Sequence, residues 1–160
     1  MQIKVFDNFL DKEYYNKLYS VVSNDNFPWY YTPCKTRPGD GNHQFIHTVF
    51  QDYVPQNIDL HNLLIDFYNK LNASAIIRNK LNCTIKENKK KVFGFHTDNE
   101  VNAITAIYYF NTTNGNTVFE SGEEYKSIAN RLITFPSHLR HSGTTHTDEY
   151  RRLVMNINFH

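Results

Sequence analysis

Cysteine is scarce in this chain, which has only Cys34 and Cys83 among its 160 residues. Their separation fits no zinc-ribbon pattern, so we expect two free thiols in a reducing compartment. Long apolar runs are missing, since no segment approaches the roughly 20 residues that a membrane span needs. The N-terminal residues include early acids and no clean apolar core, so we expect no signal peptide there. These absences favour a cytoplasmic protein without a membrane partner.

A strong net charge is also missing, because the formal charge is only +1 at pH 7. The longest block of like charges is residues 89–91, so we expect no nucleic-acid partner. Hydrophobic residues make up 40% of the chain and aromatic residues 15%, a composition that predicts a packed globule rather than a disordered segment. The length predicts one domain over residues 1–160.

Two helices are expected in the N-terminal half of the chain. Asp11 suits the N-cap of a helix over about residues 12–23. A continuous apolar stripe over residues 60–71 predicts a second helix, with Asp59 where an N-cap belongs. Short strands are expected at residues 2–6, 29–32 and 44–50.

The character of the sequence changes after residue 74. Short segments rich in β-branched and aromatic residues follow one another, separated by turn dipeptides such as Asn114-Gly115. These segments lie near residues 75–86, 91–97, 102–111, 116–120, 130–135 and 150–159. Helices followed by many short strands predict a mainly β sandwich or barrel with two or more N-terminal helices packed on one sheet. Residues 1–74 would then support a β core of residues 75–160.

The most informative feature is the pair His96 and Asp98, which is followed downstream by further histidines. Two positions apart in a strand, these two side chains would point to the same face. The candidates for a third ligand are His138, His141 and His146. Two imidazoles and one carboxylate on one face of a metal leave coordination positions open and suit non-haem Fe(II) in oxygenases. If His146 is not a ligand, we expect it to be exposed.

Five segments follow one another in the C-terminal half: His96-Thr97-Asp98, ITAIYYFN, NGNTVFE, NRLITFPSHLRH and YRRLVMNINF. In this order they resemble the 2-oxoglutarate- and Fe(II)-dependent dioxygenase superfamily, on its prolyl-4-hydroxylase-like side, including small enzymes carried by bacteriophages. The resemblance covers roughly residues 75–159, and residues 3–22 resemble the start of such domains less specifically. It implies a double-stranded β-helix, also called a jelly roll, with the iron in its mouth.

The resemblance implies that His96, Asp98 and His141 bind Fe(II), and the segment NRLITFPSHLRH favours His141 over His138. The cofactors would be Fe(II), the co-substrate 2-oxoglutarate and O2. The reaction would be hydroxylation of a C–H of a peptidyl (prolyl-like) or small-molecule substrate, with release of succinate and CO2. Asp98 argues for hydroxylation, because related halogenases replace the carboxylate ligand with a small residue. We expect a monomer or a weak homodimer, in the cytoplasm of the host cell if the chain is phage-encoded.

The family holds the far carboxylate of 2-oxoglutarate with a buried cation about ten residues past the distal histidine, where this chain has Arg151 and Arg152. Arginine suits this task because its planar fork can bind both carboxylate oxygens. If Arg152 points inward, the residues that share its face are Val154, Asn156 and Asn158. The pocket of an anionic co-substrate should be the more polar side. Arg152 is therefore preferred, with Arg151 as the alternative.

Tyr109 matches a family position whose hydroxyl reaches the far carboxylate of the co-substrate, and Asn82 is a further candidate contact. Residues 24–43 either cover the substrate, as a loop does in the prolyl-hydroxylase-like branch, or are anchored to the core through Trp29. Two other functions are open. One is a cupin-type jelly-roll metal enzyme that does not use 2-oxoglutarate, and the other is a non-catalytic jelly-roll module that binds another molecule.

Overall fold

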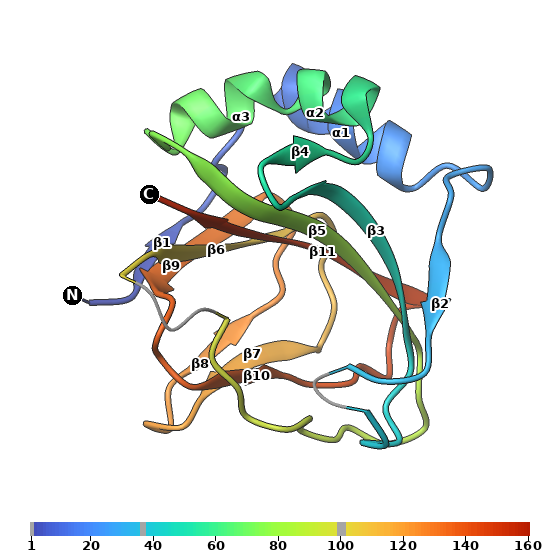
Figure 1. The fold of residues 1–160 in the computed structure, drawn as a ribbon. Helices are drawn as coiled ribbons and strands as arrows, with labels where there is room; N and C mark the ends of the chain where they lie inside the picture. Colours follow the sequence, from blue (N-terminus) through green and yellow to red (C-terminus); the bar gives the residue numbers. More distant parts are fainter. Residues whose placement is uncertain (1, 36–37, 99–101) are drawn as a thin grey trace.

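The computed structural model describes residues 2–35, 38–98 and 102–160. Two β-sheets face each other, and helices cover the outer side of the larger sheet (Figure 1). The larger sheet has the strand order β1-β9-β6-β11-β5-β3-β2, and β4 pairs with β3. Its strands are β1 (Lys4–Phe6), β2 (Tyr30–Thr32), β3 (Gln44–Gln51), β4 (Val54–Pro55), β5 (Ile76–Ile85), β6 (Ile104–Tyr109), β9 (Arg131–Pro136) and β11 (Arg151–Phe159). The predicted mainly β class is confirmed.

The smaller sheet has the order β10-β7-β8 and consists of β7 (Asn116–Phe119), β8 (Glu124–Lys126) and β10 (His141–Gly143). Residues 91–97, predicted as a strand, lie beside β10. Single bridges there pair Val92 with Thr144 and His96 with His141. From β5 to β11 the chain therefore passes back and forth between the two sheets. This path brings segments that are far apart in the sequence to opposite walls of one interior.

Three helices lie on the outer face of the larger sheet: α1 (Lys12–Val22), α2 (Ile58–Leu63) and α3 (Ile65–Lys70) (Figure 1). The predicted start of α1 is confirmed, because the Asp11 side chain accepts a hydrogen bond of 2.9 Å from the Tyr14 N–H. Leu18 and Val22 on this helix are buried against the sheet. The predicted packing of helices on one sheet is therefore confirmed.

The predicted continuous helix over residues 60–71 is wrong in two details. Asn57 caps its start in place of Asp59, and the Asn57 side chain accepts a hydrogen bond of 3.0 Å from the Leu60 N–H. The helix also breaks at Leu64, where the backbone leaves the helical region. The apolar stripe survives the break because Leu60 and Leu64 stay buried in the same cluster. Periodicity therefore located the buried face but not the break.

β11 is the central strand and fixes which side chains face the interior. It is paired with β5 on one side and β6 on the other. The residues that pack toward the helices are Leu153, Met155, Ile157 and Phe159. Burying one such side chain stabilises a fold by about 1.5–3 kcal/mol, so a one-residue slip that turned all four inward is strongly disfavoured. Arg152, Val154 and Asn156 consequently face the space between the sheets.

Three other expectations have a clear outcome. Cys34 and Cys83 are both free thiols, as predicted. The helices in the described ranges lack the length and apolar character needed to cross a membrane. The expected exposure of His146 is wrong, because its side chain is fully buried. Its carbonyl accepts a hydrogen bond of 2.9 Å from the Glu87 N–H, which ties this loop to the segment just after β5.

Candidate metal centre and cofactor pocket

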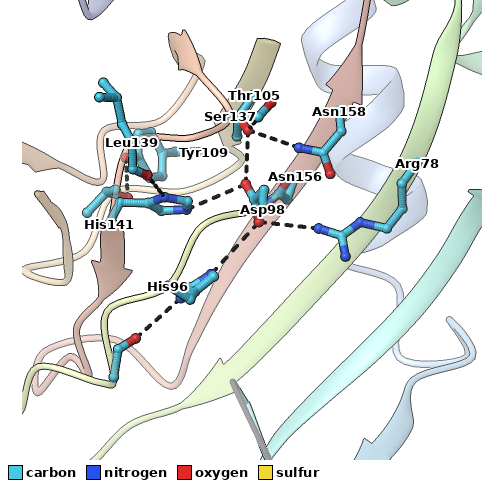
Figure 2. A network of polar contacts seen from close by, with 12 residues as sticks. Arg78, His96, Asp98, Thr105, Tyr109, Ser137, Leu139, His141, Asn156 and Asn158 are labelled. Carbon is cyan, nitrogen blue, oxygen red and sulfur yellow. Dashed lines mark hydrogen bonds and ion pairs between the residues drawn. The ribbon is translucent and has the colours of Figure 1, made fainter. Parts of the chain in front are cut away.

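His96, Asp98 and His141 come together between the two sheets (Figure 2). One ligand atom from each residue lies within 4.8 Å of the other two. The Asp98 carboxylate is 3.8 Å from His96 Nε2 and 3.5 Å from His141 Nε2. The side chains of Asp98 and His141 are only 3% exposed, whereas that of His96 is 33% exposed. The cluster is therefore open to solvent on the His96 side alone.

The backbone positions both histidines. The His96 N–H donates to the His141 carbonyl at 3.0 Å, and the His141 N–H donates to the His96 carbonyl at 2.9 Å. Each ring also has a backbone carbonyl near Nδ1, Gly94 O at 3.3 Å for His96 and Leu139 O at 3.0 Å for His141. When Nδ1–H donates to that carbonyl, the lone pair of Nε2 is left for a metal ion.

Asp98 has partners on several sides that hold its carboxylate in place (Figure 2). It accepts hydrogen bonds from Thr105 Oγ1 at 3.1 Å and from Asn156 Nδ2 at 3.2 Å. Arg78 Nη2 forms an ion pair with it at 3.3 Å. Burial acts to raise the pKa of Asp98, but the neighbouring His141 and Arg78 outweigh burial and lower that pKa. The carboxylate is therefore ionised and ready to bind a cation.

A second layer of polar groups fixes Thr105 in turn. Asn158 Nδ2 donates to Thr105 Oγ1 at 2.9 Å, and the Thr105 hydroxyl lies 3.1 Å from Ser137 Oγ (Figure 2). The carbonyl of Ser137 accepts a hydrogen bond from the Asp98 N–H at 3.2 Å. Outer partners of this kind orient metal ligands and raise affinity for the ion. Asn156 and Asn158 are both on the inner face of β11, as predicted for a strand with Arg152 inward.

His138 does not join this cluster. Its side chain is exposed, whereas His141, three residues later, is 2% exposed and faces His96 across the paired backbones. Desolvation lowers the pKa of His96, and the neighbouring His141 lowers it further, which favours the neutral ring that metals bind. Two imidazoles and one carboxylate on one side of a metal ion leave its other side free. This donor set fits a non-haem Fe(II) ion with open coordination positions.

The cluster forms part of the wall of a cavity of about 250 Å³, close to the lower end of the range for small-molecule sites. Asn82 and Arg152, the two predicted co-substrate contacts, are also on this wall. Tyr109 lies behind it. Its hydroxyl donates a hydrogen bond of 2.7 Å to Thr117 Oγ1, and Thr117 faces the cavity. Tyr109 is fully buried, and its hydroxyl contacts Thr117 rather than the cavity itself.

The two neighbouring arginines point in opposite directions. Arg151 donates through Nη2 to the carbonyl of Ser23 at the end of α1, on the helix side of the sheet. Arg152 is 4% exposed, and its guanidinium carbon lies 5.5 Å from the centre of the Tyr109 ring. Its Nε donates to Ser127 Oγ at 3.3 Å. Among the residues that the structure describes, no carboxylate lies within salt-bridge range of Arg152. A buried cation of this kind is suited to bind an anion.

Three basic residues on the cavity wall were missed by the sequence analysis: Lys35, Arg78 and Lys80. Arg78 and Lys80 alternate with Asn82 on β5, so the inward direction assigned to Asn82 could have identified them. Lys35 could not be found in this way, because it lies in an irregular segment between β2 and β3. His146 was also misjudged. Burial lowers its pKa, and the charge of Arg152 lowers it further, so it lies close to the predicted anchor.

Comparison with known proteins points to one fold. No known family profile matches the chain, and no curated protein matches it in sequence. Among solved structures it is similar to a 2OG-Fe(II) oxygenase family oxidoreductase from Burkholderia pseudomallei, with a TM-score of 0.71 and 12% identity over 98% of this chain and 84% of the other. A prolyl hydroxylase from Trichoplax adhaerens, in complex with a peptide fragment of hypoxia inducible factor, gives a TM-score of 0.65 and 14% identity over 98% of this chain and 82% of the other. A Pseudomonas putida prolyl-4-hydroxylase gives a TM-score of 0.63 and 11% identity over 98% of this chain and 91% of the other. The chain therefore has the fold of the 2-oxoglutarate- and Fe(II)-dependent oxygenases.

Proposed function

We propose that this protein is an Fe(II)- and 2-oxoglutarate-dependent dioxygenase that hydroxylates a C–H bond. The overall reaction consumes the substrate, O2 and 2-oxoglutarate, and yields the hydroxylated product, succinate and CO2. One observation carries the proposal: the cluster of His96, Asp98 and His141 shares a cavity with the buried Arg152, which has no salt bridge to any described residue. A metal with open positions and a fixed cation are the two things that a chelating dianion needs.

The proposed iron ligands and the proposed co-substrate anchor lie in different parts of the cavity wall. His96, Asp98 and His141 would hold the iron, which supplies the activation of O2 when bound. Arg152 would bind the far carboxylate of 2-oxoglutarate. Asn82 faces the same cavity, and Thr117, oriented by Tyr109, lies on the opposite sheet. Because each of these groups is on a strand or is hydrogen-bonded to residues of one, the co-substrate would meet a site that is already formed.

The broader organisation belongs to the same proposal. The alternation of β5 to β11 between two sheets supports a double-stranded β-helix with its mouth at the cluster. Residues 1–74 would act as a support for a core of residues 75–160 within one domain. The substrate would be peptidyl (prolyl-like) or a small molecule, and residues 24–43, of which 36–37 lie outside the described ranges, would border its entrance. The protein would act as a monomer or weak homodimer in the cytoplasm.

The test is a measurement of succinate formation from 2-oxoglutarate by the purified protein, with and without Fe(II) and O2. We expect turnover that needs both, and its loss in Asp98→Ala. His138→Ala is the matched control, because it removes an exposed histidine close to the centre and should keep turnover. Binding of Mn(II), followed by electron paramagnetic resonance, gives a second readout without catalysis. Turnover that survives in Asp98→Ala would remove the metal assignment.

The same experiment separates the two rival functions. A cupin-type metal enzyme would bind Mn(II) but would neither bind nor convert 2-oxoglutarate. A non-catalytic jelly-roll module would bind neither ligand, and it leaves the buried Arg152 next to the cluster unexplained.

A further inference from the structure

The cavity has more positive charge than the proposed co-substrate can neutralise. Four basic side chains line it: Lys35, Arg78, Lys80 and Arg152. Asp98 is the single carboxylate among its described lining residues. The further inference rests on the proposed function, because it asks what remains uncompensated once iron and 2-oxoglutarate are in place.

The charges form a continuous row along the wall. A Cβ built on Gly143 would lie 3.5 Å from Lys35 Nζ and 3.7 Å from Arg152 Nη1, so these two cations meet next to Gly143. Lys80 and Arg78 follow on β5, and Arg78 ends the row in its ion pair with Asp98. The row therefore runs from the predicted co-substrate anchor to the predicted metal ligand.

The charges can be assigned one by one. Fe(II) would add two positive charges, whereas Asp98 and the 2-oxoglutarate dianion together carry three negative charges. These groups leave one negative charge against four basic side chains, so the cavity keeps an excess of positive charge, and the contacts show which side chains are without a partner. Arg152 has the co-substrate as its partner and Arg78 has Asp98. Lys35 and Lys80 are left without a salt bridge to a described residue, although Asp40 and Glu87 favour the charged form of Lys35, and Asp98 that of Lys80, from farther away.

Neither lysine has a carboxylate in salt-bridge range within residues 2–35, 38–98 and 102–160. Lys35 Nζ lies over the Phe93 ring, 3.6 Å from its centre, which stabilises a cation but does not neutralise it. Burial lowers the pKa of Lys35, and the charges of Arg152 and Lys80 lower it further. The pKa of Lys80 is lowered by burial and then by Arg78. Both ammonium groups are therefore costly without an anion nearby.

We propose that the primary substrate is a small molecule that carries an anionic oxygen group, a carboxylate or a phosphate, which Lys35 and Lys80 bind in the same cavity. Two ammonium groups beside one cavity suit such an anion, since each is a compact point charge with three donors. A neutral peptidyl proline would leave both half-buried lysines beside uncharged atoms. The charge of this cavity thus favours an acidic metabolite over a prolyl peptide.

The experiment uses the full chain loaded with Mn(II), which does not turn over, and saturating 2-oxoglutarate. The probes are small carboxylic acids and phosphate monoesters, each paired with its amide, methyl ester or parent alcohol, and binding is followed by calorimetry. We expect at least one acid to bind about tenfold or more tightly than its neutral counterpart. Lys80→Gln and Lys35→Gln should each lower the affinity for that acid by about tenfold or more. The control Lys126→Gln removes an exposed lysine on β8 and should bind the acid as the wild type does.

The outcomes separate this inference from the proposed function. A preference for carboxylates over phosphate monoesters, or the reverse, identifies the anionic group. Equal binding of acids and neutral counterparts, or no binding of any acid, overturns the inference if Mn(II) and 2-oxoglutarate still bind. A loss of 2-oxoglutarate affinity in Lys80→Gln larger than its loss of acid affinity also overturns it, because the lysine would then serve the co-substrate. Failure of the wild type to bind Mn(II) or 2-oxoglutarate refutes the proposed function itself.

Discussion

Replacement of Arg152 by glutamine should remove most of the affinity for 2-oxoglutarate, whereas the same change at Arg151 should not. Arg152 is 4% exposed and faces the cavity, so its charge meets the co-substrate away from water. Truncating one partner of a buried, hydrogen-bonded charge pair costs about 2–5 kcal/mol. At about 1.4 kcal/mol per factor of ten, this corresponds to a loss of roughly 30-fold to 4000-fold in affinity.

Arg151 provides a matched control one position away on the same strand. Its guanidinium donates to the carbonyl of Ser23 at the end of α1. A cation at a helix C-terminus contributes about 0.3–1 kcal/mol, so Arg151→Gln should lower the free energy of unfolding slightly. Its affinity for 2-oxoglutarate should change by less than about twofold, because a contact outside the cavity makes no difference to the bound state.

The assay is calorimetric titration of the Mn(II)-loaded protein with 2-oxoglutarate, with thermal melting to show that each variant is folded. Arg152→Lys keeps the charge but loses the planar fork, so its affinity should lie between the wild type and Arg152→Gln. If Arg151→Gln lost its affinity for 2-oxoglutarate and Arg152→Gln kept its affinity, the co-substrate anchor would be assigned to the wrong arginine. If neither change had an effect, the cavity would not be the co-substrate site.

Three further predictions concern other parts of the molecule. His96→Ala should weaken Mn(II) binding by more than about 100-fold, since even the loss of an outer partner costs about 10–100-fold; unchanged binding in a resonance titration would exclude His96 as a ligand. Gly115→Ala should weaken 2-oxoglutarate binding by about tenfold, because the new Cβ would lie 2.8 Å from Arg152 Cδ and displace the guanidinium; normal affinity in calorimetry would mean that the arginine can move aside at no cost. Asp7→Asn removes a pair with Arg131 at 2.6 Å and should cost less than about 1 kcal/mol. The hydrogen bond from Arg131 lowers the pKa of Asp7, so the stability that this pair contributes is complete above the ordinary carboxyl pKa and disappears as the pH falls through the lowered pKa. Urea unfolding should therefore show a difference in the free energy of unfolding between variant and wild type at neutral pH that vanishes in acid. A difference that widens in acid would contradict the assignment.

The direction of the side chains on the last strand and the position of the distal histidine could be predicted from the sequence. Strict alternation along residues 151–159 placed four apolar residues on one face, and the resulting direction of Arg152 agrees with the structure. The choice of His141 over His138 came from the resemblance, and the structure places only His141 beside His96. These expectations worked because a period of two is a local property that any half-buried strand must keep.

Other features could not be read locally. The helix over residues 60–71 breaks at Leu64 while its apolar face stays continuous, so periodicity gave no sign of the break. Lys35 lies in an irregular segment, and its approach to Gly143 depends on a contact between residues more than a hundred positions apart. His146 was expected at the surface, but the loop that carries it is hydrogen-bonded to the segment just after β5, and the side chain is buried. Each of these depends on tertiary packing, which sequence patterns do not encode.

The reciprocal amide-to-carbonyl pairing of positions 96 and 141 has a consequence for ion exchange. The main chain itself sets the spacing of the two imidazoles. If the cluster holds Fe(II) as proposed, removal of the iron by a chelator should therefore leave the fold unaltered. Co(II) or Mn(II) should then bind at the same site without any rearrangement of the surrounding strands.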